Sequence, residues 1–217
     1  MSTWSEQLEI VCSKFVEKIA NQSGVVALCN GTLDNQIFSR FIMQDSIYLN
    51  SFKGSIVFLA SRLCAEHKDM MMQFAYGSVE AEQAMQNILN ERFDWRSESD
   101  KPLPITENYC NFEREKCIQS PVCDGFASLL PCFWLYFEVV KRMKEMSNKS
   151  NQFENKYQFW IDSNSDPLFQ SDITRFRALC DYYAAQRSEN EQQQMTDVFI
   201  KSAEMEMQFY SLLDGEG

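Results

Sequence analysis

The chain has 217 residues, of which 45% are hydrophobic and 24% charged, and this composition excludes a disordered or low-complexity protein. A chain of this length can form one core that buries around 70% of its unfolded surface, so we expect a single domain over residues 1–217. The formal net charge of −11 disfavours nucleic acid and anionic membranes as partners, because both require basic patches. The charge suits a neutral or cationic ligand instead.

Signals for targeting and for disulfides are sparse. The N-terminal segment Met1–Glu6 lacks the basic and apolar regions of a signal peptide, and no run of 18 or more apolar residues occurs. We therefore expect a cytoplasmic protein that does not span a membrane. The eight cysteines form no CxxC pair, which indicates reduced thiols. Because His67 is the only histidine and no CxxC pair occurs, we expect neither a zinc site nor a haem-ligating pocket.

Helical periodicity dominates the chain, which has only seven glycines and five prolines, and it predicts an all-α fold. The first helix is expected over about Trp4–Asn21, and Asp34 is a candidate N-cap for the next one. Further helices are expected over about Phe38–Asn50, Phe52–Cys64, Asp69–Trp95, Thr106–Gln119, Cys123–Met146, Gln152–Ser163, Asp166–Ala185 and Glu191–Leu213. Residues 96–104 are the clearest loop.

The nearly all-apolar run Ala127–Val140 predicts a buried helix with a proline inside it. Pro131 removes one backbone hydrogen bond and clashes with the carbonyl of Ala127, at a cost of roughly 3 kcal/mol unless the helix kinks. Cys132 and Tyr136 stand four residues apart, so they share one helix face. They are either core residues or members of a site at the kink.

Other positions combine polar groups with apolar surroundings. Asp45 and Tyr48 share a face of an apolar helix, where a buried aspartate must either cap another element or bind a polar ligand. Tyr109, at the start of the helix after the loop, is by itself a core tyrosine. Glu206 shares a face with Tyr210 near the C-terminus, and it is either a solvated glutamate of an amphipathic helix or part of a site.

Several motifs follow one another in the chain. They are Gly31-Thr32-Leu33, Gln44-Asp45-Ser46-Ile47-Tyr48-Leu49, Tyr109, Leu129-Leu130-Pro131-Cys132-Phe133-Trp134-Leu135-Tyr136, Tyr157-Gln158-Phe159-Trp160-Ile161 and Glu206-Met207-Gln208-Phe209. In this order they resemble the TenA family, also called thiaminase II or aminopyrimidine aminohydrolase. The LLPCxWLY octet with an upstream QDxxYL is the most specific part of the resemblance, which extends from about residue 30 to residue 210.

The resemblance implies an all-α, haem-oxygenase-like bundle that assembles as a homotetramer and uses no metal or prosthetic group. TenA-like enzymes hydrolyse 4-amino-5-aminomethyl-2-methylpyrimidine, a thiamin breakdown product, to the hydroxymethylpyrimidine and ammonia, and many also cleave thiamin. In this chain the implied nucleophile is Cys132, and the implied acid/base carboxylate is Glu206. The implied substrate-binding residues are Asp45, Tyr48, Tyr109, Tyr136 and Asn164.

These residue types suit the implied reaction. A 4-aminopyrimidine is electron-poor, so a thiolate can add to a ring carbon and push electrons toward expulsion of the group on the exocyclic methylene. Glu206 can accept the thiol proton and later deliver a proton to the departing amine. Asp45 can accept hydrogen bonds from the 4-amino group or from a protonated ring nitrogen, and the tyrosines can enclose the ring.

Asn164 departs from the family pattern, because most relatives carry a tyrosine there, and Gln86 stands where relatives often carry a histidine. The missing phenol leaves the preference between aminomethylpyrimidine and thiamin open, although asparagine can still donate and accept hydrogen bonds. Two alternatives remain. One is a non-catalytic pyrimidine- or thiamin-binding protein, which Cys132 argues against. The other is a haem or di-iron enzyme of the same fold, which needs histidine ligands beyond His67.

Overall fold

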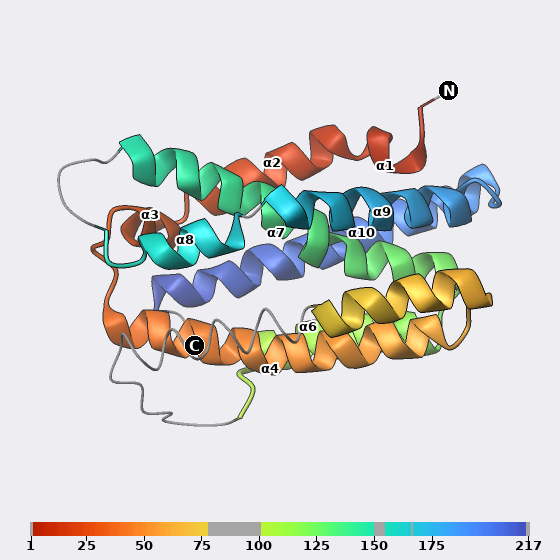
Figure 1. Ribbon diagram of the computed structural model, residues 1–217, viewed down its shortest axis with the longest axis horizontal. Coiled ribbons are helices and arrows are strands. Elements are labelled where there is room, and N and C mark those ends of the chain that lie inside the picture. Colours follow the sequence, from red (N-terminus) through yellow and green to blue (C-terminus); the bar gives the residue numbers. More distant parts are fainter. Residues whose placement is uncertain (1, 78–100, 150–154, 166, 216–217) are drawn as a thin grey trace.

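The computed structural model describes residues 2–77, 101–149, 155–165 and 167–215, and every regular element in these ranges is helical. The α-helices are α1 (Trp4–Gln7), α2 (Glu9–Ala20), α3 (Ser23–Cys29), α4 (Asn35–Ala60), α6 (Pro104–Ile118), α7 (Val122–Lys149), α8 (Gln158–Asn164), α9 (Pro167–Ala184) and α10 (Glu189–Tyr210), and a 3-10 helix, η1 (Ser211–Asp214), follows. The long helices lie roughly along one axis, with α2 on one side, α9 and α10 in the middle and α4 with α6 on the other (Figure 1). The prediction of an all-α fold is confirmed.

Helix α7 lies at the centre of the bundle. It contacts α2, α3, α4, α6, α8, α9 and α10, and Leu129, Leu130 and Leu135 along it are fully buried. By length and composition its stretch Val122–Asn148 could cross a membrane, but 72% of the most apolar part of this stretch is buried inside the protein. A helical stretch that is apolar on nearly all sides must be covered by other elements, and the neighbouring helices of the bundle cover this part of α7.

Pro131 lies inside α7 without ending the helix. A proline lacks the amide that would bond the carbonyl four residues earlier, so the backbone around it needs other hydrogen-bond donors. Next to this position, Ser202 Oγ of α10 donates to the Ser128 carbonyl at 2.6 Å, and Ser128 Oγ donates to the Gly125 carbonyl at 2.9 Å. The proline segment of α7 is therefore tied to α10 by a buried hydrogen bond.

Helix α4 replaces two predicted helices with one. The predicted N-cap is confirmed, because Asp34 accepts the backbone amides of Gln36 and Ile37 at 2.7 and 3.4 Å. The predicted boundary near residue 51 is wrong. Asn50 breaks the apolar pattern but is exposed, and its amide donates to the Ser46 carbonyl one turn earlier at 3.0 Å. A polar residue on the exposed face of a helix need not end it.

No helix was predicted between the first helix and Asp34, but α3 lies there. Gly24 in α3 allows close packing, since a Cβ at this position would collide with the backbone of Leu213 in η1. Gly31 does serve a turn: its φ of +73° is in the left-handed region that glycine tolerates, and an added Cβ would lie 3.0 Å from Asn155 Oδ1. These two glycines set the path of the chain from α2 to α4.

The other predicted boundaries differ in detail. A turn at Leu8 divides the first predicted helix into α1 and α2, and α6 begins at Pro104, before the predicted start. Residues 65–77 are helical, whereas the remainder of the predicted helix to Trp95, with Gln86, lies outside the described residues. The predicted start of the helix at Gln152 also lies outside them, and α8 begins at Gln158.

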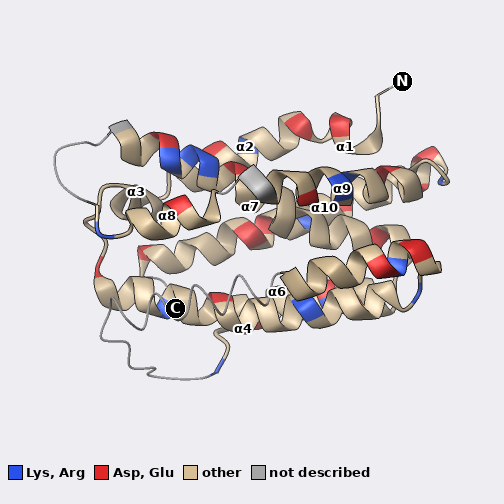
Figure 2. Cartoon of the chain, viewed as in Figure 1, with Lys and Arg blue, Asp and Glu red and all other residues tan. Residues whose placement is uncertain are grey.

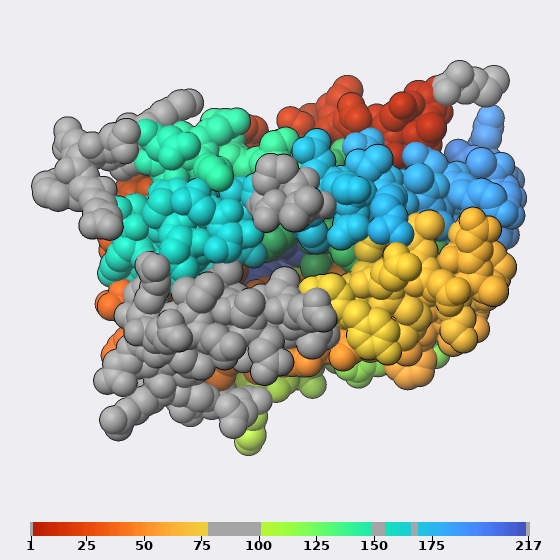
Figure 3. Space-filling view, viewed as in Figure 1, coloured from red at the N-terminus to blue at the C-terminus, as the bar shows by residue number. Residues whose placement is uncertain are grey.

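The helical segment 65–77 packs against α9, and Figure 3 shows the two side by side on one face of the molecule. The rings of Phe74 and Phe176 lie 5.7 Å apart between centroids. His67 Nδ1 lies 2.9 Å from the hydroxyl of Tyr183, so the histidine makes a contact between helices on this face. The contact explains His67 without a ligand.

Candidate active site

The predicted site residues come from different helices and lie in one connected cluster. Helix α4 supplies Asp45 and Tyr48, α6 supplies Tyr109, α7 supplies Cys132 and Tyr136, α8 supplies Asn164, and α10 supplies Glu206. Each of them is linked to at least one other by a hydrogen bond or by an electrostatic effect on a pKa. The helical spacings that placed pairs of these residues on one face therefore point them inward, toward the other helices.

Glu206 and Tyr109 form the first buried pair of this cluster. The Tyr109 hydroxyl donates to Glu206 Oε2 at 2.9 Å, and the two residues are 1% and 4% exposed. Burial raises the pKa of Glu206 from its usual 4.5 to about 7, while the hydrogen bond from Tyr109 opposes this rise. The alternative of a solvated glutamate is wrong. A carboxyl that titrates near neutral pH can both accept and donate a proton.

Glu113 and Tyr48 form a second pair of the same kind. The Tyr48 hydroxyl donates to Glu113 Oε1 at 2.8 Å, and the carboxyl residue is fully buried. Burial raises the pKa of Glu113 well above its usual range, the Tyr48 hydrogen bond lowers it, and the charge of Glu206 raises it further. The rings of Tyr48 and Tyr109 stack with centroids 4.7 Å apart and an interplanar angle of 24°, so the two pairs lie side by side.

Glu113 was not among the predicted site residues, although the sequence contains a signal for it. It follows Tyr109 by four residues in α6, so the two share a helix face. Cys110 and Cys117, three residues before it and four after it, are buried as well. A glutamate on the buried stripe of a helix must be paired or protonated.

Cys132 lies next to Pro131 and is half-buried. Burial raises the pKa of its thiol well above the usual range, and the carboxyls of Glu206 and Glu113 raise it further, whereas a hydrogen bond with Tyr48 lowers it. The thiol is therefore protonated at neutral pH. It needs a nearby proton acceptor before it can act as a nucleophile.

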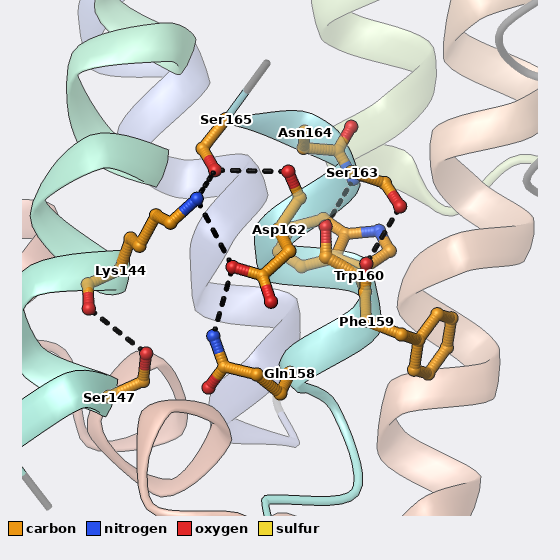
Figure 4. Close-up of polar contacts among 9 residues, drawn as sticks. All are labelled: Lys144, Ser147, Gln158, Phe159, Trp160, Asp162, Ser163, Asn164 and Ser165. Atoms are coloured by element: carbon orange, nitrogen blue, oxygen red, sulfur yellow. Dashed lines mark hydrogen bonds and ion pairs between the residues drawn. The ribbon is translucent and has the colours of Figure 1, made fainter.

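Tyr136, Asn164 and Asp45 form the more exposed part of the cluster. The Tyr136 hydroxyl donates to Asn164 Oδ1 at 2.8 Å. Asn164 Nδ2 in turn donates to the Trp160 carbonyl at 2.8 Å (Figure 4). Burial raises the pKa of Tyr136, and the charge of Asp45 is the next largest cause. Asp45 thus lies near the Tyr136 hydroxyl. The alternatives for Asp45, a cap or a ligand-binding group, both stay open.

Helix α8, which carries Asn164, is held by contacts at both of its sides. Trp160 is 1% exposed and packs edge-on against Phe38 of α4, with ring centroids 6.1 Å apart. Lys144 of α7 donates to Ser165 Oγ at 3.0 Å and lies 3.2 Å from Asp162 Oδ1 (Figure 4). These contacts fix the end of α8 opposite Tyr136.

Gln44 has a structural role that the motif did not reveal. Its side chain is buried, and its Oε1 accepts the Leu103 amide at 2.8 Å and the Thr106 hydroxyl at 2.7 Å, while its Nε2 donates to the Lys101 carbonyl at 3.1 Å. These bonds hold the first turn of α6, from which Tyr109 projects. In this motif, the Gln44 side chain therefore positions α6, whereas the charge of Asp45 acts on Cys132 and Tyr136 of the cluster.

The described residues contain no group of three or more His, Cys, Asp and Glu side chains that could hold a metal ion. Basic and acidic residues are interspersed along the described helices (Figure 2).

Tyr210 was noted in the sequence only for sharing a face with Glu206. It is 1% exposed, its hydroxyl has no hydrogen-bond partner among the described residues, and Tyr136 and Glu206 both raise its pKa after burial.

Curated relatives cover nearly the whole chain. The chain is 26% identical over 217 residues to an aminopyrimidine aminohydrolase of Bacillus subtilis (strain 168), with 96% of this chain and 89% of that protein covered. It is 24% identical to an aminopyrimidine aminohydrolase of Helicobacter pylori, with 87% and 88% covered. A thiamine biosynthesis multifunctional protein ThiED of Corynebacterium efficiens is 25% identical over 205 residues, which are 92% of this chain but 27% of that larger protein.

Solved structures have the same fold. A TenA homologue from P. horikoshii OT3 superposes with a TM-score of 0.85 at 20% identity, covering 99% of this chain and all of that one. A protein described as a TenA family transcription regulator from Silicibacter sp. TM1040 superposes with a TM-score of 0.81 at 19% identity, covering 98% and 96%. The predicted haem-oxygenase-like bundle is confirmed. Residues 25–213 match the model of the TENA/THI-4/PQQC family, and the chain therefore belongs to that family.

Proposed function

We propose that this protein is a thiamin-salvage hydrolase that converts 4-amino-5-aminomethyl-2-methylpyrimidine to 4-amino-5-hydroxymethyl-2-methylpyrimidine and ammonia. The observation that carries the proposal is the half-buried thiol of Cys132 beside a Tyr109–Glu206 pair whose carboxyl has a pKa of about 7. The names of the curated relatives from B. subtilis and H. pylori support the same reaction. The family description joins three names and does not by itself select an activity.

The proposed reaction begins with addition of the Cys132 thiolate to a ring carbon of the pyrimidine. A new C–S bond forms, and a ring electron pair moves to expel the amine from the exocyclic methylene, with Glu206 donating a proton to the leaving nitrogen. Water then adds to the methylene carbon. Loss of the cysteine restores the aromatic ring, so that one water is consumed and one ammonia is released.

The half-exposed residues supply recognition in this proposal. Asp45 accepts a hydrogen bond from the 4-amino group or from a protonated ring nitrogen, which stabilises positive charge as sulfur adds. Tyr136 lies near this carboxylate and is held by Asn164. Tyr48 and Tyr109 lie deeper and pack against the ring of the substrate. Thiamin shares the pyrimidine, so the same site supports thiamin cleavage as a second reaction.

Binding without turnover is the alternative function. A regulatory binding protein needs recognition groups such as Asp45 and Tyr136, but it gains nothing from a thiol with buried carboxyls around it. Burying Glu206 carries a cost in stability because its charge is desolvated. Catalytic sites accept such costs where a pKa near neutrality is useful, and this favours the enzyme over the binding protein.

The proposal includes a cytoplasmic homotetramer that acts without metal or prosthetic group and does not bind nucleic acid or membranes. Family resemblance supports this assembly, and large apolar side chains such as Ile10 (71% exposed) and Phe58 (50% exposed) are available for contacts between copies. Light scattering of the purified protein tests it. A mass four times that of the 25.4 kDa chain is expected.

The decisive experiment measures ammonia release from the aminomethylpyrimidine by the purified protein, with mass spectrometry of the hydroxymethyl product. Turnover that is unchanged by a chelator is the expected result. Calorimetric titration of the same compound is run in parallel. Binding without ammonia or hydroxymethyl product would replace the enzyme by the regulatory binding protein, and absence of both binding and turnover would reject the pyrimidine as ligand.

A further inference from the structure

The cluster contains a carboxyl that the proposed reaction does not use. Glu113 is fully buried, its Oε1 accepts from Tyr48, and its Oε2 has no hydrogen-bond partner among the described residues. An incompletely paired buried carboxyl lowers stability unless a function maintains it. Glutamine has the same shape and would avoid the charge, so the carboxyl chemistry itself requires an explanation.

Tyr48 connects Glu113 to the thiol. Its hydroxyl donates to Glu113 Oε1 at 2.8 Å, and a hydrogen bond with the same residue lowers the pKa of the Cys132 thiol. A phenol has one proton to donate, so when that proton points to Glu113 the oxygen of Tyr48 is free to accept the S–H proton. The hydrogen bonds then run in one direction, from sulfur through the phenol to the carboxylate.

We propose that Glu113 takes the proton of Cys132 through the Tyr48 hydroxyl, and that Glu206 serves the leaving amine alone. This inference rests on the proposed role of Cys132 as nucleophile. In the transfer the S–H bond breaks as an O–H bond forms at Tyr48, and the original phenol O–H bond breaks as one forms at Glu113. The thiolate then accepts a hydrogen bond from the Tyr48 hydroxyl. The protonated Glu113 in turn donates a hydrogen bond to the Tyr48 oxygen.

Charge favours this internal transfer over release of the proton to water. Release would leave negative charges on both Glu113 and Cys132 in one buried cluster, and the charge of Glu113 raises the pKa of the Cys132 thiol. Transfer within the cluster leaves its net charge unchanged and moves one negative charge from Glu113 to the sulfur. Glu206 is connected differently, because it accepts its hydrogen bond from Tyr109, whereas Tyr48 is the residue whose hydrogen bond lowers the pKa of the thiol.

The two Tyr–Glu pairs therefore divide the proton transfers between them. Tyr48 with Glu113 serves the nucleophile, and Tyr109 with Glu206 serves the leaving group, while stacking of the two phenol rings keeps the pairs in a fixed relation. If one carboxyl performed both transfers, it would have to take the proton of Cys132 before it could donate a proton to the leaving amine. With two carboxyls, the donation to the amine does not depend on the earlier transfer from the thiol.

The titratable groups around Glu113 come from every helix that packs on it. They are Tyr48 from α4, Tyr109, Cys110 and Cys117 from α6 itself, Cys132 from α7 and Glu206 from α10. A pH profile of the whole enzyme would mix these groups. The test therefore follows the one sulfur that the proposal concerns.

The experiment measures the rate of alkylation of Cys132 by iodoacetamide against pH in the full-length protein without substrate, resolved by mass spectrometry of its peptide. If the proton moves within the cluster, the rate in the unmodified protein levels off around neutral pH. In Glu113→Gln the proton must leave to water, so the rate should rise about tenfold per pH unit and be at least about tenfold lower at pH 7. Glu107→Gln, on the exposed side of the same helix, should behave as the unmodified protein.

The sign of the effect separates the proposal from a purely electrostatic role. Removing a negative charge beside a thiol lowers the thiol pKa and speeds alkylation, so equal or faster alkylation in Glu113→Gln overturns the proposal. A plateau that is lost in Glu206→Gln but kept in Glu113→Gln also overturns it and assigns the proton to Glu206. Circular dichroism and the melting temperature show whether each variant is folded.

Tyr48→Phe supplies a second route if Glu113→Gln fails to fold. Phenylalanine keeps the ring that stacks on Tyr109 but removes the hydroxyl, so the alkylation rate should fall as in Glu113→Gln. The double variant should be no slower than either single one. The assay needs no turnover. If Cys132→Ser retained ammonia release, the nucleophile assignment would fail while the alkylation profile would still decide the path of the proton.

Discussion

The inner and outer parts of the site differ in how their side chains are held. The inner part, Tyr48, Tyr109, Glu113 and Glu206, is at most 4% exposed, and its polar groups bond mainly to one another. The outer part, Asp45, Tyr136 and Asn164, is partly exposed and depends on the short helix α8. Burial sets the pKa values of the inner part, so we assign proton transfer to it. The outer part can change with fewer consequences for the core, so we assign substrate selection to it.

The first prediction tests the residue at the boundary between the two parts. Cys132→Ser should lower ammonia release by at least about 100-fold, because a hydroxyl is a much poorer nucleophile than a thiolate. Steady-state assay of ammonia measures the effect. Helical content and assembly should persist, since the substitution replaces sulfur with oxygen and keeps the shape of the side chain.

Cys64→Ser is the matched control, because Cys64 is exposed and lies outside the cluster. Its turnover should equal that of the unmodified protein. Near-normal turnover in Cys132→Ser would remove the nucleophile from the proposal and leave a site that activates water directly.

The second prediction concerns the inner part alone. Glu206→Gln keeps the shape of the side chain and an oxygen that can accept the hydrogen bond from Tyr109. The amide cannot accept or release a proton near neutral pH. The rate should fall by roughly 100-fold, while the pyrimidine still binds. Separate measurements of kcat and of the dissociation constant distinguish the two effects.

Glu204→Gln is the control on the same helix, since Glu204 forms a surface ion pair with Lys201 at 3.3 Å. It should leave both constants unchanged. If Glu206→Gln weakens binding and leaves kcat as it was, Glu206 is a binding group, and the division between inner and outer parts would need to be redrawn.

The third prediction uses the same carboxyl without substrate. The folded protein holds the pKa of Glu206 at about 7 against a usual 4.5. A carboxyl whose pKa is higher in the folded than in the unfolded protein stabilises the fold. This stability is fully present below the pKa of the unfolded protein and is lost as the pH rises through the pKa of the folded protein. The free energy of unfolding should therefore fall by about 2 kcal/mol between pH 5 and 7 because of this group.

Denaturant titrations at several pH values measure this loss, and comparison with Glu206→Gln isolates the contribution of the one carboxyl. The difference between the two proteins should change by about that amount over the same interval. A difference that does not vary with pH would mean that Glu206 is already ionised in the folded protein at pH 5, which would exclude it as a proton donor near neutrality.

The same contrast between regions explains what the sequence could predict. Helical spacing paired Cys132 with Tyr136 and Asp45 with Tyr48 on shared faces of apolar helices, whereas Glu206 was left open as a solvated glutamate until its burial was seen. The boundary between two predicted helices near Asn50 was wrong because an exposed polar residue interrupts a hydrophobic pattern without breaking backbone hydrogen bonds. Local spacing within one helix was therefore a better guide than changes in composition along the chain.

Contacts between helices could not be predicted in this way. The bond of Tyr48 to Glu113 joins residues 65 positions apart, and the bond of Tyr136 to Asn164 joins residues 28 apart. A single sequence shows that each residue is on a buried face but not which partner it meets there. For this reason Glu113 was missed, and Asn164 was understood as a missing phenol and not as the hydrogen-bond acceptor of Tyr136.

The last prediction is the smallest and tests the outer part. Asn164→Tyr introduces the phenol that the family resemblance leads us to expect at this position, but it removes the acceptor that holds Tyr136. Thiamin should be the weaker substrate of the unmodified protein, because it is bulkier than the aminomethylpyrimidine and its charged thiazolium depends more on the outer residues. The substitution should change the ratio of the two specificity constants by about threefold to tenfold. Tyr136→Phe removes the same hydrogen bond from the other side and should shift the ratio in a similar way if Asn164 acts through Tyr136. Equal changes for both substrates would show that the Tyr136–Asn164 bond supports the site as a whole, and selectivity would then have to be sought at Asp45.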